Sequence, residues 1–180
     1  MNLILLLSIS FLYFFSVNCV QTAYKFVHEH CEIPYFNESL VDLPLKTCYK
    51  PTRTGLALNL TLKFHVDIPS DDVAYVEIVG YQFRSNEYRK GPIEAMLGMC
   101  SFIQTEKFDM PHMLSNSNFT ACPLKKSNTY YIRNLVPDAE NFPPGIPDGR
   151  WMLELKFMYR EIYYMFGVRW FAKVEYEMVF

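Results

Sequence analysis

Apolar and polar residues alternate strictly along residues 56–66. The apolar positions are Leu56, Leu58, Leu60, Leu62, Phe64 and Val66. The polar side chains between them are Asn59, Thr61, Lys63 and His65. Because successive side chains of a β-strand point to opposite faces of its sheet, this pattern predicts a strand with one buried face. Pro69 and the pair Asp71-Asp72 predict a turn directly after it.

The last third of the chain has the same period of two. Along residues 151–160 the apolar positions are Trp151, Leu153, Leu155, Phe157 and Tyr159, and they alternate with Glu154, Lys156 and Arg160. Along residues 169–178 they are Trp170, Ala172, Val174, Tyr176 and Met178, and they alternate with Arg169, Lys173, Glu175 and Glu177. Two strands are therefore predicted here, with a reversal between residues 160 and 167 that no strong turn residue places.

Other segments complete the expected fold. Residues 73–83 are β-branched and aromatic on both faces, which favours a central strand, and residues 130–136 favour a shorter one. Residues 92–104 have helical or mixed spacing, residues 107–117 have room for one helical turn, and residues 137–149 are a loop by their proline and glycine content. We expect an all-β protein, an antiparallel β-sandwich or β-cup of roughly seven to nine strands with space for an apolar cavity.

The start of the chain predicts secretion. Residues 3–15 form an almost unbroken apolar run, and no charged side chain precedes Lys25. The run is shorter than the roughly 18 residues that cross a bilayer, which favours a signal peptide over the competing interpretation, an uncleaved anchor. We expect residues 1–19 to be removed before Val20, and residues 20–180 to form a single extracellular domain.

Cysteines and sequons fit that compartment. Loss of Cys19 with the leader leaves an even set that can form disulfides, namely Cys31, Cys48, Cys100 and Cys122. Three connectivities are open, and loop size favours Cys31–Cys48 with Cys100–Cys122. Glycosylation sequons begin at Asn37, Asn59 and Asn118, and Asn59 lies on the polar face of its predicted strand.

Charge and motifs exclude several classes of function. The 17 Lys and Arg residues nearly balance 19 Asp and Glu residues, so the chain lacks the basic excess of a nucleic-acid binder. No nucleophile elbow, metal helix, phosphate loop or calcium loop occurs, and we expect neither an enzyme nor a cofactor. The sequence His28-Glu29-His30 is the best metal candidate, but two imidazoles do not complete a zinc site. A solvent-exposed strand segment explains it better, and no metal is expected.

Composition suggests apolar contacts instead. The chain has 13 Tyr, 15 Phe and 2 Trp residues, which supply large apolar area. Four methionines, Met96, Met99, Met110 and Met113, bracket Cys100 in the least regular part of the chain. Methionine adapts to varied apolar shapes, so these residues suit either a binding surface or gap-filling in an irregular core, and the core is favoured.

One set of spacings carries a family resemblance over residues 56–180. It consists of Cys100-Ser-Phe, the stretch from Asn118 to Cys122-Pro123, Tyr131, Asn134, and Pro147-x-Gly149-x-Trp151. This set resembles a family of secreted insect proteins, of formerly unknown function, that includes the CheB-type chemosensory proteins. It is also distantly similar to the ganglioside-activator and ML lipid-recognition domains. ML domains commonly bond an N-terminal cysteine to one late in the chain, and here no cysteine follows Cys122.

The resemblance implies two splayed β-layers that hold an apolar molecule without catalysis. We therefore expect a secreted binding protein for a lipid or other hydrophobic small molecule, with a receptor or a membrane lipid surface as further partner. The candidate lining is Leu58, Leu60, Leu62, Phe64, Trp151, Leu153, Leu155, Phe157, Trp170, Val174 and Tyr176. A filled core would use the same residues, so the alternative is an extracellular protein-interaction module without a small-molecule ligand.

Processing is the first test. The secreted protein is expected to begin near Val20 and to carry glycans, because the apolar leader is followed by three sequons. N-terminal sequencing and the mobility shift after endoglycosidase treatment check this. A mature protein that keeps its leader, or that shows no shift at any sequon, contradicts it.

Overall fold

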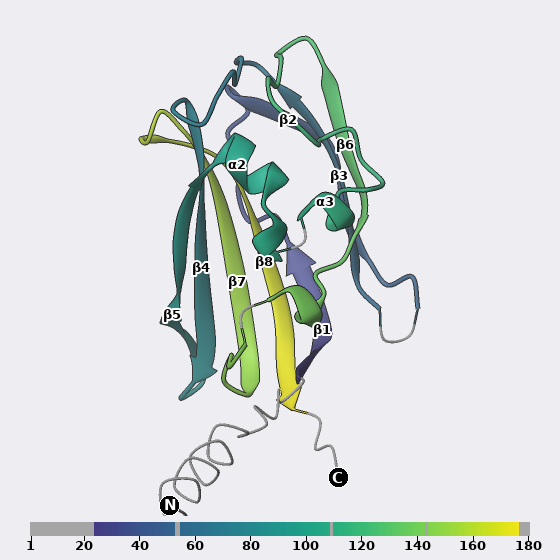
Figure 1. Ribbon diagram of the computed structural model, residues 1–180, viewed down its shortest axis with the longest axis vertical. Coiled ribbons are helices and arrows are strands. Elements are labelled where there is room, and N and C mark those ends of the chain that lie inside the picture. Colours follow the sequence, from purple (N-terminus) through teal and green to yellow (C-terminus); the bar gives the residue numbers. More distant parts are fainter. Residues whose placement is uncertain (1–23, 53–54, 109, 143, 177–180) are drawn as a thin grey trace, which may run out of the picture.

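Two antiparallel sheets face each other in the computed structural model, which describes residues 24–52, 55–108, 110–142 and 144–176 (Figure 1). The predicted signal peptide lies outside the described residues. The wider sheet has the strand order β1 (Tyr24–Glu32), β8 (Tyr163–Tyr176), β7 (Gly149–Tyr159), β4 (Ala74–Arg84) and β5 (Glu87–Gly98). The narrower sheet has the order β2 (Val41–Tyr49), β3 (Ala57–Phe64) and β6 (Thr129–Leu135). The described residues thus form eight strands, and the predicted all-β sandwich is confirmed.

The two most regular strands face each other across the core, as their alternation predicts. On β3, Leu58, Leu60, Leu62 and Phe64 are buried, whereas Lys63 on the other face is exposed. On β7, Trp151 and Phe157 are buried in the apolar core. Both strands have their apolar rows on the inner side because burial of each row removes its apolar area from water.

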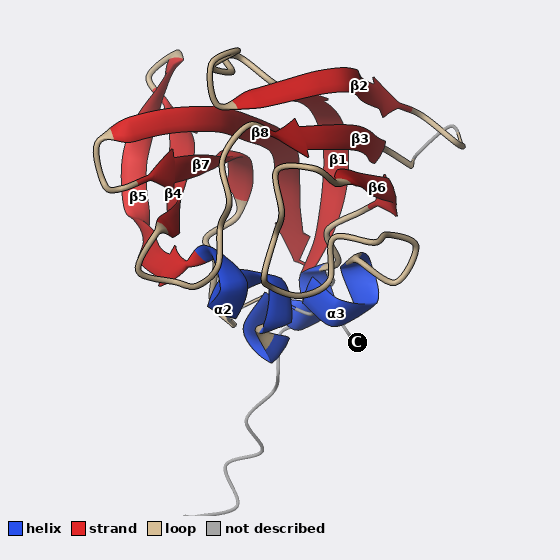
Figure 2. Cartoon of the chain, turned by 90° about the horizontal axis from the view of Figure 1, so that it is seen from above, coloured by secondary structure: helices blue, strands red, loops and turns tan. Residues whose placement is uncertain are grey.

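Short helices cover one side of the sandwich. Between β5 and β6 the chain forms α2 (Met99–Gln104), the 3-10 turn η1 (Glu106–Phe108) and α3 (Met110–Met113), and a second 3-10 turn, η2 (Ala139–Asn141), follows β6. Figure 2 shows α2 and α3 along one side, between the edges formed by β5 and β6. We call residues 99–124 the helical cover.

Disulfides and backbone bonds fasten these parts. Cys31 on β1 is bonded to Cys48 on β2, with 5.8 Å between Cα atoms, and so joins the edges of the two sheets. Cys100 is bonded to Cys122, with 5.5 Å between Cα atoms, and so joins the two ends of the helical cover. This is the pairing that loop size favours. Ile68 and Leu124 exchange two backbone hydrogen bonds of 2.8 and 2.9 Å, which attach the end of the cover beyond β3.

Two local expectations need correction. Residues 92–98 were expected to be helical or mixed but continue β5, and the helix begins at Met99. Proline is tolerated there because β5 is an edge strand, and the register shifts opposite Val79 and Tyr81. The reversal between β7 and β8 occurs at Arg160 and Glu161, both with positive φ. Neither residue type is a common turn former, so the sequence did not place the reversal.

Among the described residues, no helix is long and apolar enough to span a membrane.

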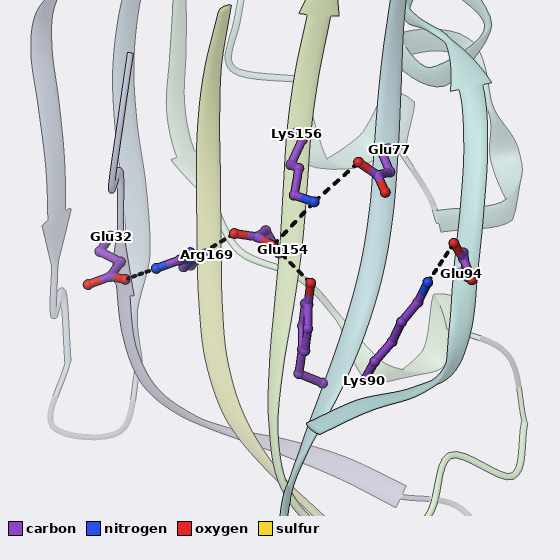
Figure 3. Close-up of polar contacts among 8 residues, drawn as sticks. Glu32, Glu77, Lys90, Glu94, Glu154, Lys156 and Arg169 are labelled. Carbon is purple, nitrogen blue, oxygen red and sulfur yellow. Dashed lines mark hydrogen bonds and ion pairs between the residues drawn. The ribbon is translucent and has the colours of Figure 1, made fainter. Parts of the chain in front are cut away.

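The outer face of the wide sheet has a chain of ion pairs across four strands (Figure 3). Glu154, which is 5% exposed, lies at its centre. The Arg169 Nε donates to its carboxylate at 2.7 Å, the Lys156 Nζ lies 3.8 Å away, and the Tyr81 hydroxyl donates at 3.3 Å. Arg169 also reaches Glu32, and Lys156 reaches Glu77, so the charges alternate in sign from β1 to β4. These pairs give the outer face a fixed register to complement the inner apolar rows.

Replacement of Glu154 by glutamine should destabilise the protein by about 1–3 kcal/mol, because Glu154 is buried and its half-buried cationic partners, Arg169 and Lys156, lose their shared anion. The matched control is Glu94→Gln, which breaks the exposed Lys90–Glu94 pair on β5 of the same sheet. That change should leave the unfolding midpoint nearly unchanged. Urea unfolding measures both, and equal midpoints for the two variants would contradict a stabilising role for Glu154.

Candidate functional site

An apolar cavity of about 80 Å³ lies between the two sheets. The narrow sheet lines it with Leu58 and Leu60 of β3 and Ile132 and Leu135 of β6. The wide sheet contributes Ile78, Leu153, Leu155, Phe157, Phe166, Val168 and Trp170. We call this space the inner cavity.

The helical cover and the segment after β6 close the third side of the inner cavity. Their lining residues are Phe102, Phe108, Met110, Met113, Leu114, Phe119, Pro137 and Phe142. Methionine has several rotatable bonds and a polarizable sulfur, so this wall adapts more easily than the two sheets. The cover is therefore the part of the lining best suited to accommodate ligands of different shape.

Among the residues that the structure describes, no side chain in the lining of the inner cavity carries a charge. The Trp170 indole Nε1 is its one side-chain N–H, and it donates to His28 Nδ1 at 3.0 Å. Water in a cavity requires two to four polar partners, and purely apolar cavities stay dry and bind apolar molecules. The lining residues that the structure describes offer apolar surface for burial, and they include no acid, base or nucleophile.

A second apolar cavity, of about 50 Å³, adjoins the first. Leu153, Trp170, Pro137 and Phe142 line both spaces. The second cavity continues along β7 to Trp151, whereas the inner cavity reaches Phe157 on the same strand. At about 3.3 Å per residue, the two cavities together follow β7 for about 20 Å.

A broader groove of about 600 Å³ opens beside these cavities, and its lining is both polar and apolar. Met113 and Pro137 line the groove and the inner cavity, and Phe26 and Pro137 line the groove and the second cavity. His28 also faces the groove. We call it the mouth groove, because it meets both cavities at these shared side chains.

His28 lies at this junction because β1 bulges. The register with β8 shifts between His28 and His30, so the two imidazoles have different neighbours. His28 lies edge-on to Trp170 with ring centroids 5.5 Å apart, whereas His30 stacks on Phe171 at 3.9 Å. The interpretation of residues 28–30 as a uniformly solvent-exposed strand segment is therefore wrong for His28. Among the described residues, no group of three or more His, Cys, Asp or Glu side chains could hold a metal ion.

The environment of His28 keeps its imidazole neutral. Burial lowers the pKa of His28 from 6.5, and this effect outweighs the opposing influence of the Asp138 carboxylate and of the hydrogen bond to the Pro137 backbone. A neutral ring is required here, because Nδ1 accepts the hydrogen bond from the indole N–H only when it carries no proton itself. The Trp170 ring, a wall of both cavities, is thus oriented by an unprotonated histidine.

The structure brings most of the sequence-predicted lining residues together, but not all. Leu58, Leu60, Leu155 and Phe157 line the inner cavity, Trp151 and Val174 line the second cavity, and Leu153 and Trp170 line both. Leu62 and Phe64 are fully buried in the core away from the cavities. Tyr176 packs near Tyr24, and its hydroxyl donates to the Ile146 carbonyl at 2.7 Å.

Several residues that line the inner cavity are absent from the lining predicted from the sequence. Phe166 and Val168 belong to the same alternation as Trp170 and Ala172, and this period of two is the sequence signal that identifies them. Of the four methionines, Met110 and Met113 line the inner cavity, Met99 is buried in the core, and Met96 is 69% exposed. The aromatic residues of the cover have no periodic signal, since their position depends on the tertiary fold.

Comparisons with known proteins find one family that matches part of the chain and a solved structure that is similar to it. A family described as "Protein of unknown function (DUF1091)" matches residues 78–153, which run from β4 into β7. Among solved structures, the chain is similar to a Niemann-Pick type C2 protein from the Japanese carpenter ant, with a TM-score of 0.40 and 12% identity. That match covers 79% of this chain and 96% of the ant protein. No curated protein matches the sequence.

The lowered pKa of His28 predicts a pH-dependent stability. The unfolded chain binds a proton at this residue near pH 6.5, but the folded chain binds it only at lower pH, so stability should fall as the pH decreases below about 6.5. His28→Asn should weaken this loss of stability at low pH, because an amide oxygen accepts the hydrogen bond from the indole N–H and does not titrate.

Melting temperatures between about pH 7.5 and about pH 5.5 measure the effect. The matched control is His30→Asn, which removes a histidine that is exposed on the same strand. If the melting temperatures of the parent protein and of both variants change equally with pH, then His28 does not couple protonation to folding.

Proposed function

We propose that this chain binds a lipid or another hydrophobic small molecule between its two sheets. The main support is the pair of adjoining apolar cavities, whose described lining residues carry no charge. Both cavities meet the mouth groove, at Met113, Pro137 and Phe26. Binding would remove apolar ligand surface from water at roughly 25 cal/mol per Å², before the cost of association is subtracted.

The cover supports the proposal because it provides a way for the cavity to adapt. The resting cavities, at about 80 and 50 Å³, are small. Two methionines and Phe108 form part of the wall, and these side chains belong to short helices rather than to a sheet. A ligand that displaces them enlarges the space without breaking the ladders of either sheet.

The setting of this activity is part of the same proposal. The apolar leader, the two disulfides and the sequons support secretion, and the resemblance to CheB-type and ML proteins supports a carrier that presents its ligand to a receptor or collects it from a membrane surface. An interaction module without a ligand would be expected to have a filled core. The two cavities favour the carrier.

A cavity-filling substitution tests the proposal. Leu155→Phe should lower the affinity for an apolar fluorescent probe such as N-phenyl-naphthylamine by about tenfold, because the ring occupies ligand space. Its melting temperature should stay close to that of the parent protein, since the added atoms enter a void. The parent should bind the probe saturably at a single site per chain.

The matched control is Leu62→Phe on the opposite sheet. Leu62 is fully buried but does not line the cavities, so the larger ring should overpack the core and cost roughly 1–3 kcal/mol of stability. No saturable probe binding by the parent, or unchanged binding by Leu155→Phe, would overturn the carrier proposal.

A further inference from the structure

The mouth groove differs chemically from the cavities that it joins. The described lining residues of the cavities carry no charge, whereas the groove is lined by Lys25 and His28 of β1 and by Asp138 and Glu140 around η2. Ser115 and Asn116 add hydroxyl and amide groups after α3. Polar chemistry is thus confined to the groove, directly outside the apolar space.

The change from apolar to polar lining occurs at a few shared side chains. Met113 and Pro137 have one side toward the inner cavity and another toward the groove. A molecule that extends past them has one end in an apolar environment and the other among hydrogen-bonding groups. A polar end buried in the cavities would lose its hydrogen bonds to water without replacement, which is costly, so the lining orients an amphipathic molecule with its polar end outward.

The charges of the groove select among polar ends. Lys25 contributes one positive charge, and Asp138 and Glu140 contribute two negative charges. The Asp138 carboxylate accepts the Glu140 backbone N–H at 3.2 Å, which holds it at the start of η2. The lining also includes the imidazoles of His28, which is neutral, and of His112. The formal charges of Lys25, Asp138 and Glu140 sum to −1, so the groove disfavours an anion.

We infer that the mouth groove holds the polar end of the ligand, and that this end is a hydroxyl or amine rather than a carboxylate or phosphate. The inference rests on the proposed function and narrows the ligand to amphipathic molecules without negative charge. Hydroxyl and ammonium groups donate hydrogen bonds, and the carboxylates of Asp138 and Glu140 are strong acceptors for them.

Three ligands with the same alkyl chain test the inference, namely decanol, decylamine and decanoate. Each is titrated against the bound N-phenyl-naphthylamine probe near neutral pH at low salt. Decanol and decylamine should displace the probe at about tenfold lower concentration than decanoate. The disadvantage of decanoate should shrink as salt rises, because the groove is open to solvent and its charges are screened.

A double variant, Asp138→Asn with Glu140→Gln, should bring decanoate to within about twofold of decanol and decylamine, because the two carboxylates that repel it are gone. Asparagine still caps η2, so the loop is retained. The matched control, Glu87→Gln with Glu94→Gln, removes two exposed carboxylates of β5 and gives the same change in net charge. It should leave the order of the three ligands as in the parent.

The outcomes separate the two proposals. If the parent does not bind the probe, the proposed function itself fails. If the probe binds but decanoate displaces it as well as decanol does, the proposed binding in the cavities is kept and the assignment of the mouth groove is overturned. The same holds if the groove variant and the control behave alike.

Discussion

The five-stranded sheet presents a wider apolar face than a three-stranded sheet can cover. β3 and its neighbours bury part of that face, and the remainder requires a third wall. The helical cover provides this wall between the edges β5 and β6 (Figure 2). Because short helices and turns do not interdigitate with a sheet as regularly as a second sheet does, apolar space is left where the three walls meet. The inner cavity follows from this mismatch.

The mismatch also explains where the chain is fastened. Cys31–Cys48 holds the edges of the two sheets together, and Cys100–Cys122 holds the ends of the cover. The cover is further attached by the Ile68–Leu124 backbone pair and by the Asp71 carboxylate, which accepts the Ser101 backbone N–H at 2.9 Å. Both sides of the sandwich are thus held at their margins. The cavity wall between those points is left to methionine and phenylalanine side chains.

Polar groups are arranged around the cavity rather than within it. The ion pairs centred on Glu154 lie on the outer face of the wide sheet (Figure 3). The neighbouring residues of the same strand, Leu153 and Leu155, point to the inner face and line the cavity. The hydrogen bond from Trp170 to His28 is the point at which a cavity wall meets a polar group. It supplies the buried indole N–H with an acceptor and places a titratable ring between the apolar space and the mouth groove.

Strict alternation predicts the fold class and the inward rows of β3, β7 and the second half of β8, because it assigns each side chain to one face of a strand. Alternation has no information about what lies opposite. It therefore treated Leu62 and Leu60 alike, although the first is in filled core and the second lines a cavity. The helical or mixed spacing of residues 92–104 does not predict that residues 92–98 continue β5, because the ladder to β4 outweighs local propensity on an edge strand.

The cavity and its mouth depend on contacts between elements that are far apart in the sequence. The cover residues come from a segment without periodicity, and the bulge that separates His28 from His30 arises from pairing with β8. The junction of groove and cavities joins β1, α3 and the segment after β6, which are far apart along the chain. Local patterns determine which face of a strand is apolar, whereas the space between faces depends on how elements of unequal width pack together.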